Sequence, residues 1–358
     1  MKRLFSLYIK IFSVFLCLIL LLLVLTPAFV PKYVDGFATT SVMDGFYELD
    51  ENSIDVLFLG SSQIMTAASP MQLYKETGIT SYNMGTEQQN LVSSYYLLKE
   101  ALRYQTPQVV VLETWFLFPY NTNSLLNSSE EFVRKPIDYM QWSSNKLEFI
   151  RTVCSLDSEH NFSGYVFPFL RFHSRWNDLT LEDFTYVFET KTNPARGFCI
   201  TANTIPQGFQ GLVLSDPNNC AEPLETMKQY FDNIVSLCKE NNITLVLMKT
   251  PRGDGSFGEN YHNCVQALAE ENRLVFIDFN EKSLFDEINF DCSADCTDVS
   301  HVNYFGAEKI TRYLSDYLAS NFTLKDQREN PDYNNWNEDL TIYLEQIPDE
   351  KNELPVQD

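Results

Sequence analysis

Positive charge is scarce in this sequence. Its 358 residues include 26 lysines and arginines against 48 aspartates and glutamates, which gives a formal net charge of -22 at pH 7. A protein that binds nucleic acid along its phosphate backbone needs a basic face, and one that lies flat on anionic lipid needs clustered Lys and Arg. The sequence therefore argues against both partners, and favours an acidic surface that repels its own copies in solution.

Histidine is scarce as well, with four copies at positions 160, 173, 262 and 301. His301 has an acidic residue, Asp298, at the third position upstream, in a segment that leads into an expected helix. A metal site made by Cys292, Cys296 and His301 is an alternative use of this segment, but the spacing is not a usual zinc pattern and lacks a clear fourth ligand. We therefore expect neither a metal nor another cofactor. We also find no internal repeat.

Charge is missing altogether from residues 11–30, an apolar run that follows Lys2, Arg3 and Lys10. About 20 apolar residues suffice to span the hydrocarbon core of a bilayer. A cleavable signal peptide usually has a shorter apolar core and an A-x-A-like site, which this sequence lacks. We predict an uncleaved anchor within residues 1–34, with the N-terminus in the cytoplasm and the rest of the chain outside the cell. A cleaved signal peptide and a released protein are the alternative.

Eight cysteines are present, and seven of them lie beyond the anchor. Disulfides persist outside the cytoplasm, and an odd number leaves at least one thiol unpaired or paired between chains. A Cys292–Cys296 disulfide would brace the segment before Asp298, and Cys199–Cys220 is a second possible pair. The sequence alone leaves the connectivity open.

Strand and helix patterns alternate through most of the chain. Continuous apolar runs, typical of strands buried on both faces, are followed by segments with apolar residues at helical spacing. Such alternation predicts an α/β fold, a parallel sheet with helices on both faces. The expected strands are 54–59, 79–83, 109–112, 243–248 and 274–278, and the expected helices are one starting at Ser69-Pro70 and those at 90–104, 223–241, 261–271 and 305–319.

Three segments do not follow this alternation. Residues 31–52 are expected to be a connector. Residues 116–220, rich in Asn, Ser and aromatics, are predicted to be an insertion, part helical and part irregular, that forms either a lid over the active face or a peripheral helical layer. Residues 325–358 form a polar, acidic tail for which disorder is expected, although residues 341–344 would also suit a small strand or a docking segment.

The first strand ends at Gly60-Ser61-Ser62, which makes Ser62 a candidate nucleophile. A serine hydroxyl attacks poorly until a base removes its proton, and a histidine oriented by a carboxylate is such a base. Asp298 and His301 supply these two groups on one turn. The plainer alternative is that Ser61 and Ser62 only cap the following helix and that Asp298 caps the next one.

Other candidates also follow expected strands, where the chemistry of parallel sheets gathers. The Gly85 N–H would help to bind an oxyanion, or Gly85 only makes a turn. Glu113 and Thr114 would line the pocket or only cap the third strand. Arg252 would hold an anionic substrate group, although pairing with a surface acid is the simpler expectation.

These segments resemble the SGNH/GDSL hydrolase superfamily. Gly60-Ser61-Ser62 stands where that superfamily has Gly-Asp-Ser, Gly85 matches the glycine of its second block, and Asp298-Val299-Ser300-His301 matches its Asp-x-x-His. The third block, normally Gly-x-Asn-Asp, reads Leu112-Glu113-Thr114-Trp115 here, so the usual Asn donor to the oxyanion is missing. The resemblance covers residues 54–113 and 224–320.

The resemblance implies a flavodoxin-like three-layer α/β/α domain over residues 35–324, with a Ser62–His301–Asp298 triad. The Gly-Ser-Ser variant and the anchor look most like the envelope-modifying branch, which includes D-alanine transfer proteins and exopolysaccharide acetyltransferase-like proteins. This implies an extracellular esterase or O-acyltransferase acting on acyl esters of a cell-envelope glycan, with a polytopic membrane acyltransferase as a possible partner. A catalytically inactive scaffold that binds a glycan or such a partner is the rival hypothesis.

Overall fold

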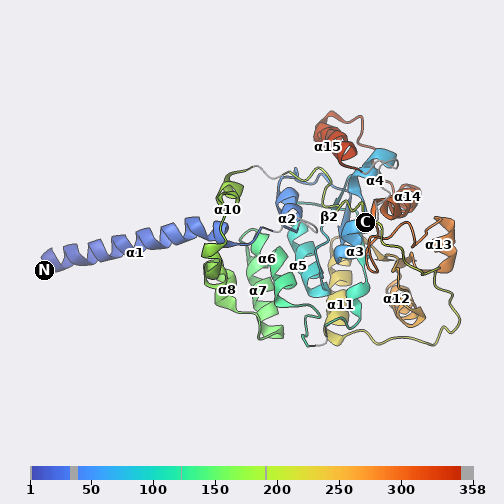
Figure 1. The fold of residues 1–358 in the computed structure, drawn as a ribbon, viewed down its shortest axis with the longest axis horizontal. Helices are drawn as coiled ribbons and strands as arrows, with labels where there is room; N and C mark the ends of the chain where they lie inside the picture. Colours follow the sequence, from blue (N-terminus) through green and yellow to red (C-terminus); the bar gives the residue numbers. More distant parts are fainter. Residues whose placement is uncertain (1, 33–38, 122, 190–191, 348–358) are drawn as a thin grey trace, which may run out of the picture.

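A parallel sheet of five strands forms the centre of the protein. The computed structural model describes residues 2–32, 39–121, 123–189 and 192–347 (Figure 1). The strand order is β2-β1-β3-β4-β5, and every neighbouring pair is parallel. This is the flavodoxin-like order, in which the chain reverses direction across the sheet next to β1. The strands are β1 (Val56–Leu59), β2 (Ser81–Asn83), β3 (Val109–Glu113), β4 (Thr244–Lys249) and β5 (Val275–Asp278).

Helices cover both faces of this sheet, so the predicted three-layer α/β fold is confirmed. On one side α5 packs against α11, and on the other side α3 and α4 pack against α14, while α12 contacts β5 (Figure 1). Their bounds are α3 (Ser62–Ala67), α4 (Pro70–Thr77), α5 (Leu91–Ala101), α11 (Glu225–Glu240), α12 (Glu259–Asn272), α13 (Lys282–Glu287) and α14 (Tyr304–Asn321). The short helix α3, directly after Gly-Ser-Ser, is missing from the expected helices, although capping of a following helix was the alternative role for Ser61 and Ser62.

The sequence patterns placed the strands well because each one is buried almost along its whole length. Predicted and observed strand ends agree within two residues. Helix starts were set by side-chain caps: Ser69 accepts a hydrogen bond from the Gln72 amide at the start of α4, and Asn90 accepts one from the Ser93 amide at the start of α5. Capping residues of this type satisfy backbone donors that a helix leaves without partners.

The expected connector at 31–52 is partly wrong, because it contains a packed helix, α2 (Thr39–Tyr47). Met43 and Phe46 of α2 are buried in the main core. Val42 and Phe46 also contact Tyr82 of β2, through a 2.7 Å hydrogen bond from the Tyr82 hydroxyl to the Val42 carbonyl and an edge-on ring contact. Burial of these side chains outweighs the weak helical pattern of the segment.

The expectation of a disordered tail is also wrong for residues 331–346. They form η4 (Pro331–Tyr333) and α15 (Asn334–Gln346), and α15 packs on α4. Trp336 and Tyr343 are each 1% exposed, and the Tyr343 hydroxyl accepts a hydrogen bond from Ser69 Oγ. The segment docks as a helix because these two large aromatic side chains, seven residues or about two helical turns apart, lie on the same face of α15 and are both buried. Residues 348–358 lie outside the described residues.

The insertion consists of two different parts. Its first part is a helical layer beside the end of α1 (Lys2–Phe29), drawn in green in Figure 1. Its second part, residues 195–212, runs irregularly along the loops that carry the candidate site. The layer consists of η1 (Trp115–Leu117), α6 (Glu130–Tyr139), α7 (Ser144–Leu156), α8 (Phe162–Val166), α9 (Pro168–Phe172), η2 (His173–Asn177), α10 (Leu181–Thr185) and η3 (Tyr186–Phe188).

Neither of the possible disulfides, Cys292–Cys296 and Cys199–Cys220, is formed in the structure. Cys292 and Cys296 are both buried, and their side chains are hydrogen-bonded to each other. The loop that they occupy is braced by backbone contacts instead, because the Ile205 amide donates to the Cys296 carbonyl and the Gln207 amide to that of Cys292.

Candidate active site

Ser62 stands at the sharp turn between β1 and α3. Gly60 has a φ of +149°, and a Cβ at this position would lie 2.5 Å from the Cβ of Glu113, so a larger residue does not fit there. Ser61 is the N-cap of α3, and Ser62 is the first residue of the helix, 9% exposed. The turn thereby holds the Ser62 hydroxyl at the carboxyl end of the sheet.

The structure brings Ser62, His301 and Asp298 together in a line of hydrogen bonds. Ser62 Oγ lies 2.8 Å from His301 Nε2, although the two residues are 239 positions apart in the chain. On the other side of the ring, His301 Nδ1 lies 2.8 Å from Asp298 Oδ2 and 3.0 Å from Oδ1. A proton on Nδ1, directed at the carboxylate, leaves Nε2 as the acceptor for the serine proton.

Asp298 is held in its charged form by its own turn. Its Oδ1 accepts hydrogen bonds from the backbone amides of Ser300 (2.7 Å) and His301 (2.9 Å). Partial burial favours the neutral carboxyl, but the hydrogen bond and charge of His301, together with these two amides, outweigh it and lower the pKa of Asp298 below its usual value. A carboxylate that stays ionised can hold the imidazole in one tautomer and stabilise its protonated form.

The His301 turn is anchored from both sides. Asn303 caps α14 by accepting a hydrogen bond from the Gly306 amide at 3.1 Å, and its side-chain amide donates to the Ala294 carbonyl at 2.7 Å. From the second part of the insertion, Thr201 Oγ1 donates to the Val302 carbonyl at 3.1 Å. Residues 195–212 therefore lie next to the site and support the loop that carries His301.

The backbone amide of Ser62 is a suitable donor to an oxyanion, because it has no acceptor among the described residues. The Gly85 amide, expected to be a second donor, is already used: it donates to Asn83 Oδ1 at 3.0 Å. Gly85 is needed for close packing instead, since a Cβ there would lie 2.8 Å from Ile64 Cγ2 and 3.1 Å from the Ser61 carbonyl oxygen. The prediction for its N–H is not met in this structure.

Thr114 does not line the site either. It is fully buried, and both its amide and its hydroxyl donate to the Met248 carbonyl, at 3.1 and 3.3 Å. Its side chain thus ties β3 to β4, which corrects the expectation that it would face the substrate.

Glu113 belongs to a buried polar network directly beneath the serine turn. Its Oε2 accepts from Ser61 Oγ at 3.0 Å, and its Oε1 accepts from the Trp115 amide at 2.8 Å and lies 3.4 Å from the ammonium of Lys249. Lys249 also donates to Gln63 Oε1, which accepts from Thr250 Oγ1 as well. The network joins the ends of β1, β3 and β4, so Glu113 has a positioning role rather than a place in the pocket lining.

Sequence reasoning missed Gln63 and Lys249. Lys249 is 0% exposed, and burial lowers its pKa to about 8, against the opposing charge of Glu113. The available signal was a lysine at the end of an apolar strand. A lysine at such a place is buried only with a partner, so Lys249 indicated a buried ion pair.

Arg252 pairs with a nearby acid, which was the simpler of the two roles expected for it. Its Nε and Nη2 each donate to the Asp254 carboxylate at 3.2 Å, and its guanidinium lies 4.3 Å from the centre of the Trp115 ring. The residue is 7% exposed.

A second His–Asp pair lies on α12 and β5. His262 Nδ1 is 2.7 Å from Asp278 Oδ2, and Asp278 Oδ1 accepts from the amide of Asn280 and from its side chain. No serine or cysteine hydrogen-bonds to His262 in the described part of the chain, so this pair holds a loop in place. In the same described residues, no group of three or more His, Cys, Asp or Glu side chains is arranged to hold a metal ion.

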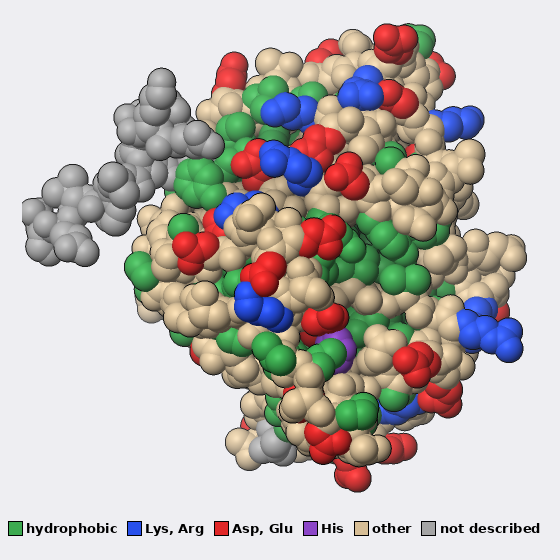
Figure 2. Space-filling model, turned by 90° about the vertical axis from the view of Figure 1, so that its right-hand side faces the viewer, with side chains coloured by type: hydrophobic (Ala, Val, Ile, Leu, Met, Phe, Trp, Pro, Cys, Tyr) green, Lys and Arg blue, Asp and Glu red, His purple; other side chains and the backbone are tan. Residues whose placement is uncertain are grey.

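On the face of the molecule shown in Figure 2, hydrophobic side chains line a hollow bordered by acidic ones. The acidic border agrees with the overall charge of -22. A neutral or cationic ligand would approach such a face more readily than an anionic one.

Comparison with known proteins identifies no family: no family model and no curated protein matches the chain. Among solved structures, the chain is similar to a protein of Bacteroides fragilis NCTC 9343, provisionally described as an acylhydrolase. The identity is 12%, over 77% of this chain and 92% of that one, with a TM-score of 0.33. It is also similar to a gut microbial enzyme that metabolises diltiazem, with 14% identity, over 77% of this chain but 48% of that one, and a TM-score of 0.25. Such low TM-scores carry no argument about activity.

Proposed function

We propose that this chain is a serine esterase or O-acyltransferase of the SGNH type. The observation that carries the proposal is the Ser62–His301–Asp298 line, with donor-to-acceptor distances of 2.8 Å at both of its joints. A hydroxyl, an imidazole and a charged carboxylate in this order activate an oxygen nucleophile.

In the proposed reaction, Ser62 Oγ attacks the acyl carbon of an ester while its proton passes to His301 Nε2. The Ser62 amide donates to the negative oxygen of the tetrahedral intermediate. His301 then protonates the departing alkoxide as the ester C–O bond breaks, which leaves an acyl-Ser62. An acceptor hydroxyl gives its proton to His301 and attacks the acyl carbon, and Ser62 Oγ regains the proton as it leaves.

The acceptor decides between the two activities. Water makes the protein an esterase, and a hydroxyl of a cell-envelope glycan makes it a transferase. We propose a glycan ester as the substrate on the basis of the sequence resemblance, and a polytopic membrane acyltransferase as a partner that would supply the acyl group.

We further propose that α1 anchors the protein in the cell membrane with the sheet domain outside. The segment Phe5–Phe29 is long and apolar enough to span a bilayer. Aromatic side chains collect at the interfaces of membranes, and the helical layer around the end of α1 exposes several of them. These are Phe162, Phe167, Trp176, Phe184 and Phe188.

The proposal is tested by labelling the full-length protein in detergent with a fluorophosphonate probe, which reacts with activated serines. Wild type should be labelled at Ser62, and Ser62→Ala and His301→Ala should lose the label. His262→Asn is the matched control: it removes the histidine of the other His–Asp pair and should keep the label. A folded wild type that is not labelled would contradict the proposal.

The rival hypothesis, an inactive scaffold, is favoured by one observation. The Gly85 amide is occupied and Thr114 faces β4, so the oxyanion site of the described residues contains fewer donors than an SGNH enzyme usually has. If wild type and Ser62→Ala bind the same acylated glycan equally well and neither releases acyl groups, the scaffold hypothesis is the better one.

A further inference from the structure

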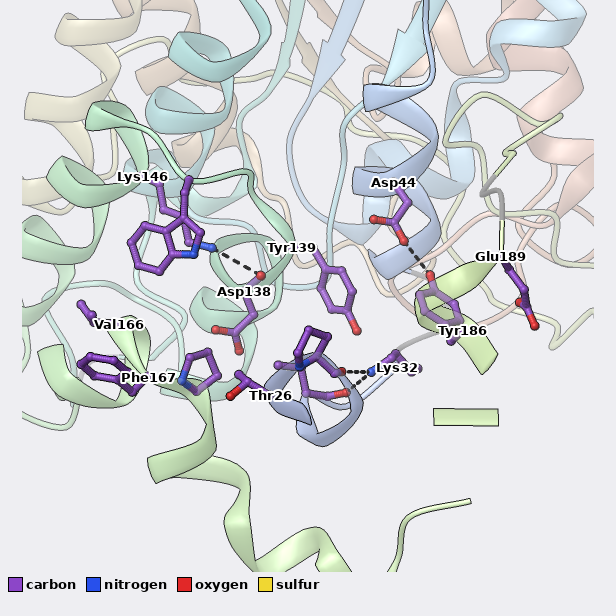
Figure 3. Close-up of a pocket in the computed structure, with 14 residues that line it drawn as sticks. Thr26, Lys32, Asp44, Asp138, Tyr139, Lys146, Val166, Phe167, Tyr186 and Glu189 are labelled. Carbon is purple, nitrogen blue, oxygen red and sulfur yellow. Dashed lines mark hydrogen bonds between the residues drawn. The ribbon is translucent and has the colours of Figure 1, made fainter. Parts of the chain in front are cut away.

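A cavity separate from the serine site lies where the end of α1 meets the helical layer and α2 (Figure 3). Its volume is about 410 Å³, within the usual range of ligand pockets. Its lining comes from five parts of the chain, including Thr26 of α1, Asp44 of α2, Asp138 of α6, Phe167 and Tyr186. Ser62, Asp298 and His301 take no part in it.

An apolar groove of about 240 Å³ adjoins this cavity, because Thr26 and Phe167 line both. The rest of the groove is made by Ile19 and Leu22 of α1 and by Phe169 and Leu170 of α9. A polar chamber next to an apolar groove has the shape and chemistry of a site for one amphiphilic molecule, with its head group in the chamber and its chain in the groove.

The cations of the chamber are already satisfied by the protein. The Lys32 ammonium donates to the carbonyls of Pro27 and Val30, and that of Lys146 donates to the Met140 carbonyl at 2.7 Å and the Asp138 carbonyl at 3.4 Å. Each ammonium therefore has carbonyl partners, which reduces the attraction of the chamber for an anionic head group.

One acceptor of the chamber is not satisfied. Asp138 Oδ2 accepts from Arg134 Nε at 2.7 Å, but Oδ1 is buried and has no donor among the described residues. In Figure 3 the Asp138 carboxyl group points toward the side of the cavity where Thr26 lies. Burial raises the pKa of Asp138 to about 6, although the charges of Arg134 and Lys146 act in the opposite direction. A buried acceptor without a donor is costly, and a ligand that donates to it removes that cost.

Aromatic rings line the same chamber as this acceptor. Tyr139, Trp142, Phe167 and Tyr186 line the chamber, and the Lys146 ammonium already lies 4.7 Å from the centre of the Trp142 ring. Ring faces attract cations, and a carboxylate among aromatic rings suits an ammonium group better than a neutral one.

We propose that this cavity binds a membrane lipid whose head group has a protonated amine, with the amine at Asp138 and an acyl chain in the groove along α1. The proposal rests on the membrane anchoring proposed above. Leu22 and Thr26 lie within the segment Phe5–Phe29, so in an anchored protein the groove opens into the bilayer and the chamber lies at its outer surface. A lipid enters such a site sideways, without leaving the membrane.

The test is native mass spectrometry of the full-length protein released from detergent micelles. The micelles contain equal amounts of phosphatidylethanolamine and phosphatidylglycerol with identical acyl chains. Wild type should retain one phosphatidylethanolamine in preference to phosphatidylglycerol. Asp138→Asn should reduce that preference about tenfold, the usual cost of one charge-assisted hydrogen bond. Asp178→Asn, which removes an exposed carboxylate of the same layer outside the cavity, should leave it unchanged.

Two further arms keep the result decisive. Trp142→Leu alters a half-exposed ring on the cavity and should also reduce retention if Asp138→Asn fails to fold. Dodecylammonium should displace the retained lipid, and dodecanol should not. Equal retention of both lipids, displacement by dodecanol as well, or full retention by folded Asp138→Asn would overturn the proposal. Fluorophosphonate labelling of the same samples shows separately whether the serine site is intact.

Discussion

Adjacent serines have different partners in this protein. Ser61 donates to Glu113 in the buried network, whereas Ser62, one position later, faces His301. The difference arises from the turn at Gly60 and the start of α3, which point successive side chains in different directions. Function at this site therefore depends on single residues rather than on the Gly-Ser-Ser motif as a whole.

Asp298→Asn should slow acyl-ester cleavage about 10³-fold or more, because an amide does not hold the productive tautomer of His301 or stabilise its charge. The measurement is the hydrolysis rate of p-nitrophenyl acetate by the purified protein. Asp291→Asn, which changes an exposed carboxylate of the same loop that contacts Ser293, is the control and should keep the wild-type rate. An unchanged rate in Asp298→Asn would exclude the triad.

Lys249→Met should destabilise the fold by about 3–5 kcal/mol, because it leaves Glu113 as a buried charge without its cation. The double variant Glu113→Gln/Lys249→Met should cost clearly less than the sum of the two single changes, since it removes both charges. Urea unfolding of the four proteins measures this coupling. Additive costs would mean that the 3.4 Å ion pair contributes nothing.

At the scale of elements, α15 is the least expected part of the fold. Trp336 lies between Tyr74, with ring centres 5.3 Å apart, and the guanidinium of Arg196, 4.3 Å from its ring centre. Arg196 also pairs with Asp339 of α15 at 2.6 Å. These contacts attach the helix to α4 and to the segment that continues toward the site.

Trp336→Ala should release α15 locally. Truncation of a buried tryptophan costs about 3–5 kcal/mol, which exceeds the free energy of local unfolding that we expect for a single peripheral helix. Hydrogen exchange of residues 334–346 should become much faster, while exchange in β1 and β3 stays slow. Leu344→Ala, which truncates a 40% exposed side chain of the same helix, is the control and should change little. Equally slow exchange in both variants would contradict the docking.

At the scale of the whole molecule, α1 and the exposed rings of the helical layer lie on the same side of the sheet domain (Figure 1). The chain has four tryptophans, and two of them differ strongly in exposure. Trp176 lies in the helical layer and is 67% exposed, whereas Trp336 lies in α15 and is 1% exposed. They can therefore report which side of the protein the membrane meets.

Full-length protein in bilayers with brominated acyl chains should lose part of its tryptophan fluorescence, because bromine quenches rings that reach the lipid. Trp176→Phe should remove a large part of the quenchable signal, and Trp336→Phe should remove none of it. The measurement compares each variant in brominated and ordinary lipid. Equal quenching of the signal in the two variants would mean that the layer does not touch the bilayer.

The sequence by itself determined the strands, the long apolar helix and the three residues of the proposed triad. It did so because these features are local: apolar runs, caps and the Asp-x-x-His spacing are visible over a few residues. Only the tertiary structure decided that the Gly85 amide is occupied, that Thr114 faces β4, and that Lys249 pairs with the carboxylate that accepts a hydrogen bond from Ser61. It also decided that Asp44, Asp138 and Tyr186 share one cavity with the end of α1. Such contacts join residues tens to hundreds of positions apart, and packing around a common core, rather than any local pattern, sets which of them meet.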